Sequence, residues 1–140
     1  VPARGDLGGI ERALASGAAV LDLRPADEFG RGHIPGTVNI PLNKSFSTWA
    51  GWLVKYDQQI HLIVSESDAP RAVRELAMIG LDAVAARYDL DVVAAYAATG
   101  KSLGTVAKTD VAAAAAKVEK AQITVLDVRN RSEFESGHLP

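Results

Sequence analysis

Apolar residues follow two spacings along this chain. Short continuous apolar runs predict buried strands, and apolar residues recurring every three or four positions predict helices. The predicted strands are residues 19–23, 38–40, 61–64 and 83–86. The predicted helices are one spanning Leu7 to Leu14, capped by Asp6 and ended by Gly17, a short turn at 25–29, and residues 45–54, 70–79 and 91–98. This alternation predicts an α/β fold, a mostly parallel sheet with helices on both faces.

A block of sixteen residues occurs twice. Residues 20–35 return as residues 125–140, with nine of the sixteen positions identical at one offset of 105. That offset is about the length of one small domain. We therefore expect a complete domain at 1–104, with a polar linker candidate at 101–108.

The second copy is expected at 105–140. Thr109 or Asp110 caps an alanine-rich helix, and residues 123–128 restart the strand pattern. The copy stops inside its own motif, which predicts that the sequence is a piece of a larger protein.

Composition narrows the function classes. The chain is 48% hydrophobic with a net charge of −2, and its acidic and basic residues are mixed. This pattern argues against a nucleic-acid-binding face and a polybasic membrane patch, and the apolar runs are too short for a membrane span. With no cysteine, the sequence has no disulfide, no thiolate chemistry and no cysteine-ligated zinc. We expect a cytoplasmic protein with no cofactor in this segment, and homo-oligomerisation stays open.

The repeated block resembles the first strand and following turn of the rhodanese fold. The matching pieces are the Leu-Asp-Leu-Arg run at 21–24, Glu-Phe at 28–29 and Gly-His-Ile-Pro-Gly at 32–36. The resemblance implies a full rhodanese-like domain over about residues 5–100 and the start of another at 109–140.

Residues 39–53 carry a narrower resemblance. They are similar to the first rhodanese-like domain of bacterial-type fusion proteins that begin with a metallo-β-lactamase-fold domain, of the persulfide dioxygenase and glyoxalase II kind. The resemblance implies two intramolecular partners, a metallo-β-lactamase-fold domain and a second rhodanese domain, and a role in sulfur metabolism.

The family's catalytic cysteine follows the strand at 61–64, and here that position holds Ser65. Helix and loop N–H groups normally stabilise a thiolate or persulfide there. The loop lacks the usual glycine, is about two residues short and adds two acids; it comprises Ser65, Glu66, Ser67, Asp68, Ala69, Pro70 and Arg71. We therefore expect no catalytic residue in this domain.

Ser65 as a different nucleophile would require a neighbouring base. His61 lies four residues earlier on the same strand, roughly 13 Å away at ~3.3 Å per residue. A serine that simply begins a turn is the preferred interpretation.

Several polar residues recur in both copies, which favours a structural role over catalysis. Asp22 is expected to accept turn amides, and Arg24 to pair with Glu28 or a carbonyl; Asp127 and Arg129 repeat them. His33 and His138 are interpreted as packed, hydrogen-bonded turn residues rather than ligands. The three histidines are scattered, so no metal site of the metallo-β-lactamase type is expected in this segment.

Phe46, Trp49 and Trp52 form an aromatic stripe on the predicted helix at 45–54. Core packing is one interpretation. Docking of a neighbouring domain is the other, because two tryptophans supply much apolar area.

Three functions follow. The preferred one is a catalytically inactive rhodanese-like domain that serves as a structural or docking module in a sulfur-metabolism fusion protein. The alternative is a fragment of an active thiosulfate or persulfide sulfurtransferase whose catalytic cysteine lies beyond Pro140, in a parent that also holds a metal-dependent oxygenase or hydrolase. A phosphatase relative of the fold ranks last, because such enzymes need a loop cysteine and a longer loop.

Overall fold

The computed structural model describes residues 2–138. The chain divides after Val106 into two compact units, which are described separately.

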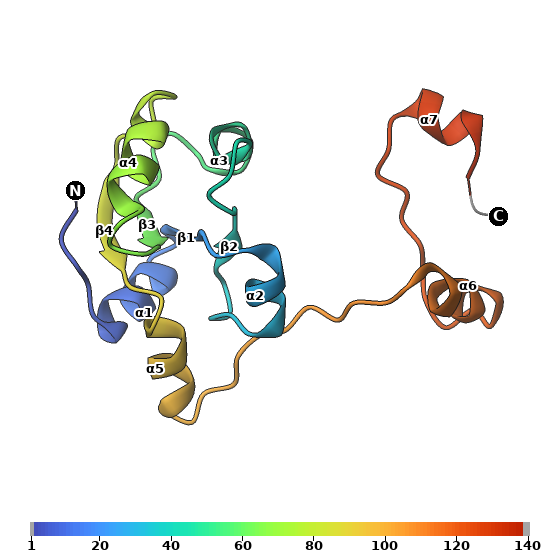
Figure 1. Ribbon diagram of the computed structural model, residues 1–140, viewed down its shortest axis with the longest axis horizontal. Helices are drawn as coiled ribbons and strands as arrows, with labels where there is room; N and C mark the ends of the chain where they lie inside the picture. The colour runs from blue at the N-terminus through green and yellow to red at the C-terminus, as the bar shows by residue number, and fades with distance from the viewer. Residues whose placement is uncertain (1, 139–140) are drawn as a thin grey trace. The chain divides into compact units, whose positions relative to one another are not determined.

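A parallel sheet forms the centre of the first unit (Figure 1). Its strands are β1 (Ala19–Asp22), β2 (Val38–Asn39), β3 (Ile60–Ile63) and β4 (Val84–Tyr88), in the order β2-β1-β3-β4. All three strand pairs are parallel. The predicted α/β class with a parallel sheet is confirmed.

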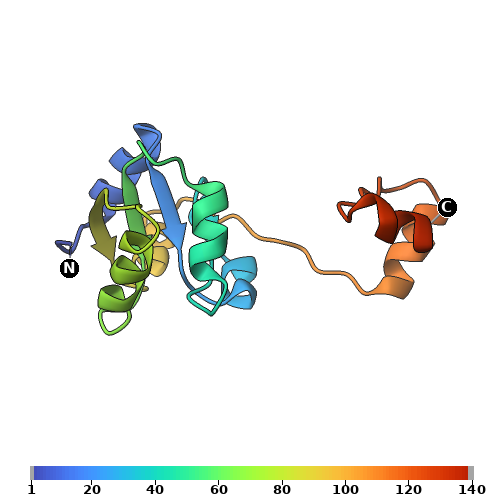
Figure 2. The same cartoon turned by 90° about the horizontal axis from the view of Figure 1, so that it is seen from above.

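Five helices belong to this unit, α1 (Leu7–Ala15), α2 (Ala26–Arg31), α3 (Phe46–Leu53), α4 (Ala69–Ala77) and α5 (Val92–Ala98). Side chains of α1 and α5 form one buried cluster with Val20 and Ile63. Side chains of α3 and α4 form another with Leu21 and Leu62. Neighbouring residues of a strand point to opposite faces, so the two clusters lie on opposite faces of the sheet (Figure 2). Helices on both faces are thus confirmed.

Two boundaries differ from the expectation. The last strand was expected at 83–86 but runs to Tyr88, because Arg87 and Tyr88 pair with Leu62 and Ile63 of β3. The expected linker at 101–108 is hydrogen-bonded to the first unit through Gly104 and Val106. Gly104 and His33 exchange two backbone hydrogen bonds of 3.0 and 2.9 Å, and the Val106 amide donates to the Gly30 carbonyl.

The second unit contains α6 (Val111–Glu119) and α7 (Arg131–Ser136). The strand expected at 123–128 is not formed, so that prediction was wrong. In the first unit the equivalent residues form β1 because β2 and β3 hydrogen-bond to it on both sides. Within residues 107–138 no strand offers such partners, and Leu126 and Val128 are more than 80% exposed. Among the described residues, no helix has the length and apolar character needed to cross a membrane.

Candidate functional site

The loop after β3 forms hydrogen bonds back to its first residue, Ser65. The Ser65 hydroxyl donates to Asp68 Oδ2 at 2.8 Å and lies 3.0 Å from Ser67 Oγ. Ser65 Oγ also accepts from the Asp68 amide at 3.2 Å. The Ser65 carbonyl accepts from the amides of Asp68 at 3.2 Å and Ala69 at 3.1 Å. Ser65 therefore begins a tight, internally bonded turn.

This turn leads directly into α4. The N-terminal end of a helix attracts an anion through its free amides and its dipole. Here the amides of Asp68 and Ala69 are already bonded, and Pro70 has no N–H to contribute. The Asp68 carboxylate itself lies at this helix end as the N-terminal flanking residue. The loop thus places a carboxylate, bonded to the Ser65 hydroxyl, at the helix end that would otherwise favour an anion.

A small cavity of about 110 Å³ lies beside this loop. It is formed by residues that follow the carboxyl ends of β1, β3 and β4, where ligands of open parallel sheets usually bind. Its lining residues are Leu23, Arg24, Pro25, Glu28, Leu42, Val64, Ser65, Asp68 and Leu90. The Arg24 guanidinium is paired with Asp22, which leaves two carboxylates, Glu28 and Asp68, as the uncompensated charges of the lining.

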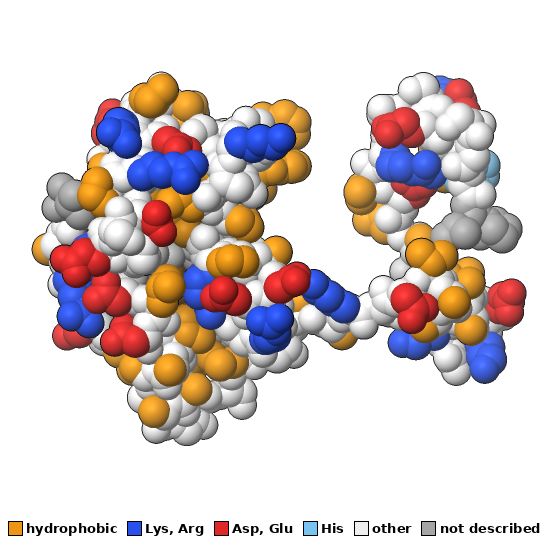
Figure 3. All heavy atoms as spheres, viewed as in Figure 1, with side chains coloured by type: hydrophobic (Ala, Val, Ile, Leu, Met, Phe, Trp, Pro, Cys, Tyr) orange, Lys and Arg blue, Asp and Glu red, His pale blue; other side chains and the backbone are white. Residues whose placement is uncertain are grey.

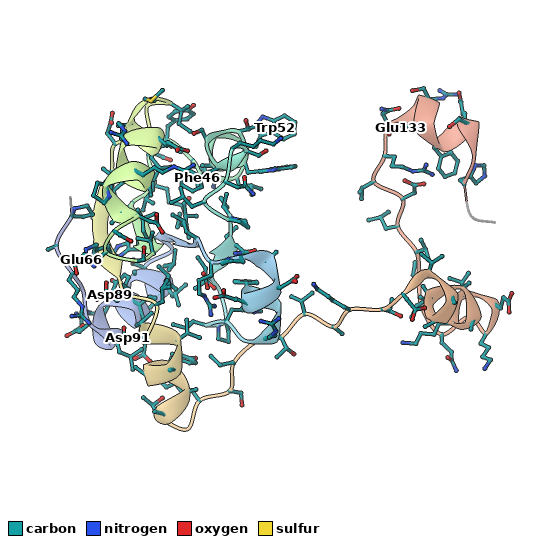
Figure 4. The ribbon with its side chains drawn as sticks, in the orientation of Figure 1. Phe46, Trp52, Glu66, Asp89, Asp91 and Glu133 are labelled. Carbon is teal, nitrogen blue, oxygen red and sulfur yellow. The ribbon has the colours of Figure 1, made fainter. Side chains whose placement is uncertain are left out.

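Glu66 extends from the same loop toward β4. Its carboxylate lies 3.5 Å from the nearly buried Arg87 guanidinium, which also pairs with Asp89. Arg4 lies 2.8 Å from Asp89 and 3.7 Å from Asp91 (Figure 4). This network ties the loop to the N-terminal segment. Sequence reasoning missed Arg87; a charged residue within an apolar strand was the available signal.

His61 takes no part in the loop. Its Nδ1 lies 3.0 Å from the Tyr88 hydroxyl, and the two rings stack at 5.9 Å. Burial lowers the pKa of His61 and is the main cause that raises the pKa of Tyr88. Both line a separate open groove of about 830 Å³ beside α1. The side chains bonded to Ser65 are Ser67 and Asp68, so the structure brings no imidazole to its hydroxyl.

Asp22 and Arg24 form a forked ion pair at the end of β1. Arg24 Nη2 lies 2.6 Å from Asp22 Oδ2, and the Arg24 amide donates to Asp22 Oδ1 at 3.1 Å. Arg24 also donates to the Gly32 carbonyl at 3.0 Å, while Glu28 is not its partner. This fork and carbonyl contact tie β1 to the turn after α2.

His33 completes this turn. Its ring stacks on Phe29 with centroids 3.8 Å apart, and its Nδ1 donates to the Phe29 carbonyl at 3.0 Å. His33 is thus held by packing and by a hydrogen bond.

The second unit repeats this geometry. Arg129 Nη2 lies 2.6 Å from Asp127 Oδ2 and 2.9 Å from the Gly137 carbonyl. His138 stacks on Phe134 at 3.9 Å and donates to its carbonyl at 2.9 Å. The distances agree within 0.1 Å with those of the first copy, although this copy is exposed. The motif is therefore encoded locally, by residues within one turn and one short helix.

The aromatic stripe on α3 is divided. Phe46 is fully buried in the cluster beneath α3, so its assignment as a docking residue was wrong: it points into the core. Trp49 is half exposed, and Trp52 is 78% exposed and points away from the sheet (Figure 4). Among residues 2–138, no group of three or more histidine, aspartate and glutamate residues is arranged to hold a metal ion.

The family model of the rhodanese-like domain matches residues 9–95. No curated protein matches the chain. The solved Alr3790 protein of Anabaena sp. is 17% identical, with a TM-score of 0.59 over 84% of this chain and 99% of that one. A rhodanese-related protein of Thermoplasma volcanium is 18% identical, with a TM-score of 0.54 over 73% and 97%. These two show the fold.

A metallo-β-lactamase from Staphylococcus aureus is 38% identical over 51% of this chain, with a TM-score of 0.49. The matched region spans 21% of that protein.

Proposed function

This chain belongs to the rhodanese-like domain family, and on that premise we propose that it is a catalytically inactive member. It serves as a structural or docking module within a larger sulfur-metabolism protein of the metallo-β-lactamase–rhodanese type. The fusion rests on the resemblance of residues 39–53 to the first rhodanese module of such proteins. The domain works in the cytoplasm and needs no cofactor of its own.

The observation that carries this proposal is Ser65 at the position of the family's cysteine. A sulfurtransferase passes sulfur through a persulfide on a thiolate, which is both a nucleophile and a leaving group near neutral pH. A serine hydroxyl does not ionise near neutral pH unaided, and its oxygen cannot replace sulfur in that carrier. The hydroxyl of Ser65 is engaged with Asp68 and Ser67 within its own loop.

The charges around the loop support the same proposal. Thiosulfate and persulfides are anions, whereas Glu28 and Asp68 line the cavity beside Ser65. Two of the loop amides, those of Asp68 and Ala69, are bonded to the Ser65 carbonyl, and Pro70 has no N–H to offer. A thiolate introduced at position 65 would therefore have fewer amides to stabilise it and two carboxylates nearby.

The second copy offers an alternative location for sulfur transfer in a longer protein. Residues 127–138 repeat the fork and the aromatic–histidine stack of the first copy. A cysteine in the equivalent loop of that copy would make the parent a thiosulfate or persulfide sulfurtransferase, with the first domain as its inactive companion.

The test is a thiosulfate–cyanide sulfur-transfer assay on the full chain and on Ser65→Cys. We expect the wild-type chain to match the protein-free background, and the variant to stay there because two loop amides are bonded and two carboxylates line the cavity. Transfer by the wild-type chain would overturn the proposal. A Ser65→Cys variant that turns over thiosulfate would refute the part of the argument that rests on the loop.

A further inference from the structure

The open groove beside α1 is a second candidate site, separate from the Ser65 loop. Its volume of about 830 Å³ lies within the range of ordinary small-molecule sites. One wall is a face of α1 formed by Gly9, Arg12 and Ala13, which are three or four positions apart. Residues 4–6, β3 and β4 contribute most of the remaining lining. Among the described residues, none lines both this groove and the cavity beside Ser65.

The rim of the groove is held in place by hydrogen bonds and an ion pair. The Gly5 amide donates to the Arg87 carbonyl at 2.8 Å, and the Arg87 amide donates to the Ala3 carbonyl at 3.0 Å. The Arg4 side chain is paired with Asp89 at 2.8 Å. Figure 3 shows red and blue side chains close together at the left margin of the first unit, where Figure 4 labels Asp89. The N-terminal segment is thus fixed along β4, and the groove is preformed.

Tyr88 lies beneath this rim and is 1% exposed. A Cβ added at Gly5 would overlap the Tyr88 ring, and one added at Gly9 would lie 3.2 Å from the hydroxyl oxygen. The two glycines therefore allow the backbone to lie directly on the ring. This packing fixes the position of the Tyr88 hydroxyl.

The fixed hydroxyl determines which nitrogen of His61 carries the proton. Tyr88 Oη lies 3.0 Å from His61 Nδ1, its only hydrogen-bond partner among the described residues. Burial lowers the pKa of His61 and is the main cause that raises the pKa of Tyr88, so both side chains are neutral near pH 7. A neutral phenol needs an acceptor for its proton, and Nδ1 is that acceptor. The proton of the imidazole is therefore on Nε2.

The Nε2–H group of His61 is available to a ligand. Every buried side-chain nitrogen and oxygen of the described residues has a hydrogen-bond partner. His61 Nε2 has none within residues 2–138, so it must be accessible to solvent. Because His61 lines the groove, this atom is a positioned donor there.

Arg12 supplies a second donor and a positive charge. Its Nη2 atom lies 3.9 Å from the Asp6 carboxylate, and its side chain is 78% exposed. Asp6 also accepts a hydrogen bond of 2.7 Å from the Gly9 amide as the cap of α1. Asp6 is the one acid of the described lining, against Arg4 and Arg12, so the lining carries a net charge of about +1 near pH 7. Since Arg4 is engaged at the rim, Arg12 is the cation left to turn toward a ligand.

We propose that this groove binds a small organic carboxylate. One carboxylate oxygen accepts from His61 Nε2, and the other pairs with the Arg12 guanidinium in a charge-assisted hydrogen bond. Gly9, Ala13 and Ala86 carry no polar side chain, so they form a floor for the apolar body of the ligand. The groove thus gives the domain a ligand-binding function beyond the docking role and independent of the Ser65 loop.

Benzoate is the probe, and benzamide is its neutral counterpart of nearly the same shape. We expect benzoate to bind the full chain with a millimolar dissociation constant, followed by amide shifts in proton–nitrogen NMR spectra that map to α1, β3 and β4. Benzamide should bind about tenfold more weakly, because it lacks the charge that Arg12 pairs with. Inorganic phosphate should also bind more weakly than benzoate, because it has no apolar body for the floor.

Two substitutions test the donors. Arg12→Gln should weaken benzoate binding about tenfold. Arg74→Gln removes an exposed arginine of α4 outside the groove and should leave benzoate binding unchanged. Tyr88→Phe should weaken binding severalfold, because Tyr88 positions the His61 proton. Nitrogen-15 NMR of the ring should show the proton on Nε2 in the wild-type chain and mixed tautomers in Tyr88→Phe, a change that lost packing alone would not produce.

Three outcomes would overturn the proposal: no shift changes at tens of millimolar benzoate, benzamide or phosphate binding as tightly as benzoate, and a His61 ring protonated on Nδ1 in the wild-type chain. Each of these would leave the inactive loop untouched. Sulfur transfer by the wild-type chain would instead overturn the inactive loop and leave the groove standing.

Discussion

Arg24 donates hydrogen bonds to the Asp22 carboxylate from both its Nε and its Nη2 atoms, and Arg129 binds Asp127 in the same way. The two pairs differ in burial. Asp22 is fully buried and the Arg24 side chain is 10% exposed, whereas the side chains of the second pair are 23% and 44% exposed. One sequence motif thus gives the same contact in two dielectric environments.

Removing the buried arginine should be costly. Arg24→Ala leaves the Asp22 carboxylate buried and unpaired, so we expect a loss of about 3–5 kcal/mol in the free energy of unfolding. Urea unfolding followed by tryptophan emission measures it. The matched control is Arg129→Ala, which should leave the unfolding midpoint of the first unit unchanged. Equal, small effects at both sites would contradict this assignment.

The exposed pair should respond to acid. Hydrogen bonds from the Arg129 side chain, then from its amide, lower the pKa of Asp127 to about 2. Since this value lies below the ~3.9 of a free aspartate, the fork stabilises its unit fully above about pH 4, and that contribution is lost as pH falls through about 2. Carbon-13 NMR titration of the Asp127 carboxyl measures the pKa, and Arg129→Gln should raise it. A midpoint near 4 in the wild-type chain would show that the fork is open.

Phe46 should prove essential to the core. Phe46→Ala removes a fully buried ring from the cluster beneath α3, so a loss of about 3–5 kcal/mol in unfolding free energy is expected. Phe134→Ala serves as the control, because Phe134 is exposed in the second unit. It should leave denaturant unfolding of the first unit unchanged. A Phe46→Ala protein of wild-type stability would contradict its assignment to the core.

A side chain at Gly104 should be destabilising while His33 is present. A Cβ at this position would lie 2.5 Å from His33 Nε2, and the imidazole cannot move freely because Phe29 holds it. Gly104→Ala should cost about 1–3 kcal/mol. Adding His33→Ala should recover part of that loss, and thermal unfolding of the two single variants and the double variant checks this. Full additivity of the two losses would exclude the steric explanation.

The pattern of apolar residues was sufficient to predict much of the sheet. Residues 61–64 read as an apolar run, and β3 occupies Ile60–Ile63. The same reading failed at residues 123–128, whose apolar pattern matches β1. A strand needs hydrogen-bonding partners as well as pattern, and among the described residues this segment has none.

The candidate site also has a part that the sequence predicts and a part that it does not. Ser65 and its acidic neighbours can be read from the order of residues alone, because they follow a strand and precede a helix. The pairing of Arg87 with Glu66 and Asp89 could not be predicted from the sequence, because it depends on how β4 and the loop after β3 come together. The division of the aromatic stripe also required the structure, since only packing shows that Phe46 turns inward and Trp52 outward.

The repeated motif also bears on the order of events during synthesis. The fork, the carbonyl contact and the aromatic–histidine stack need only residues 22–33, and the second copy assembles them without a sheet. Contacts so close in sequence carry a small loop-closure cost and form early. A nascent chain can therefore form this turn before β3 is free to pair, giving the later strands a formed edge on which to pair.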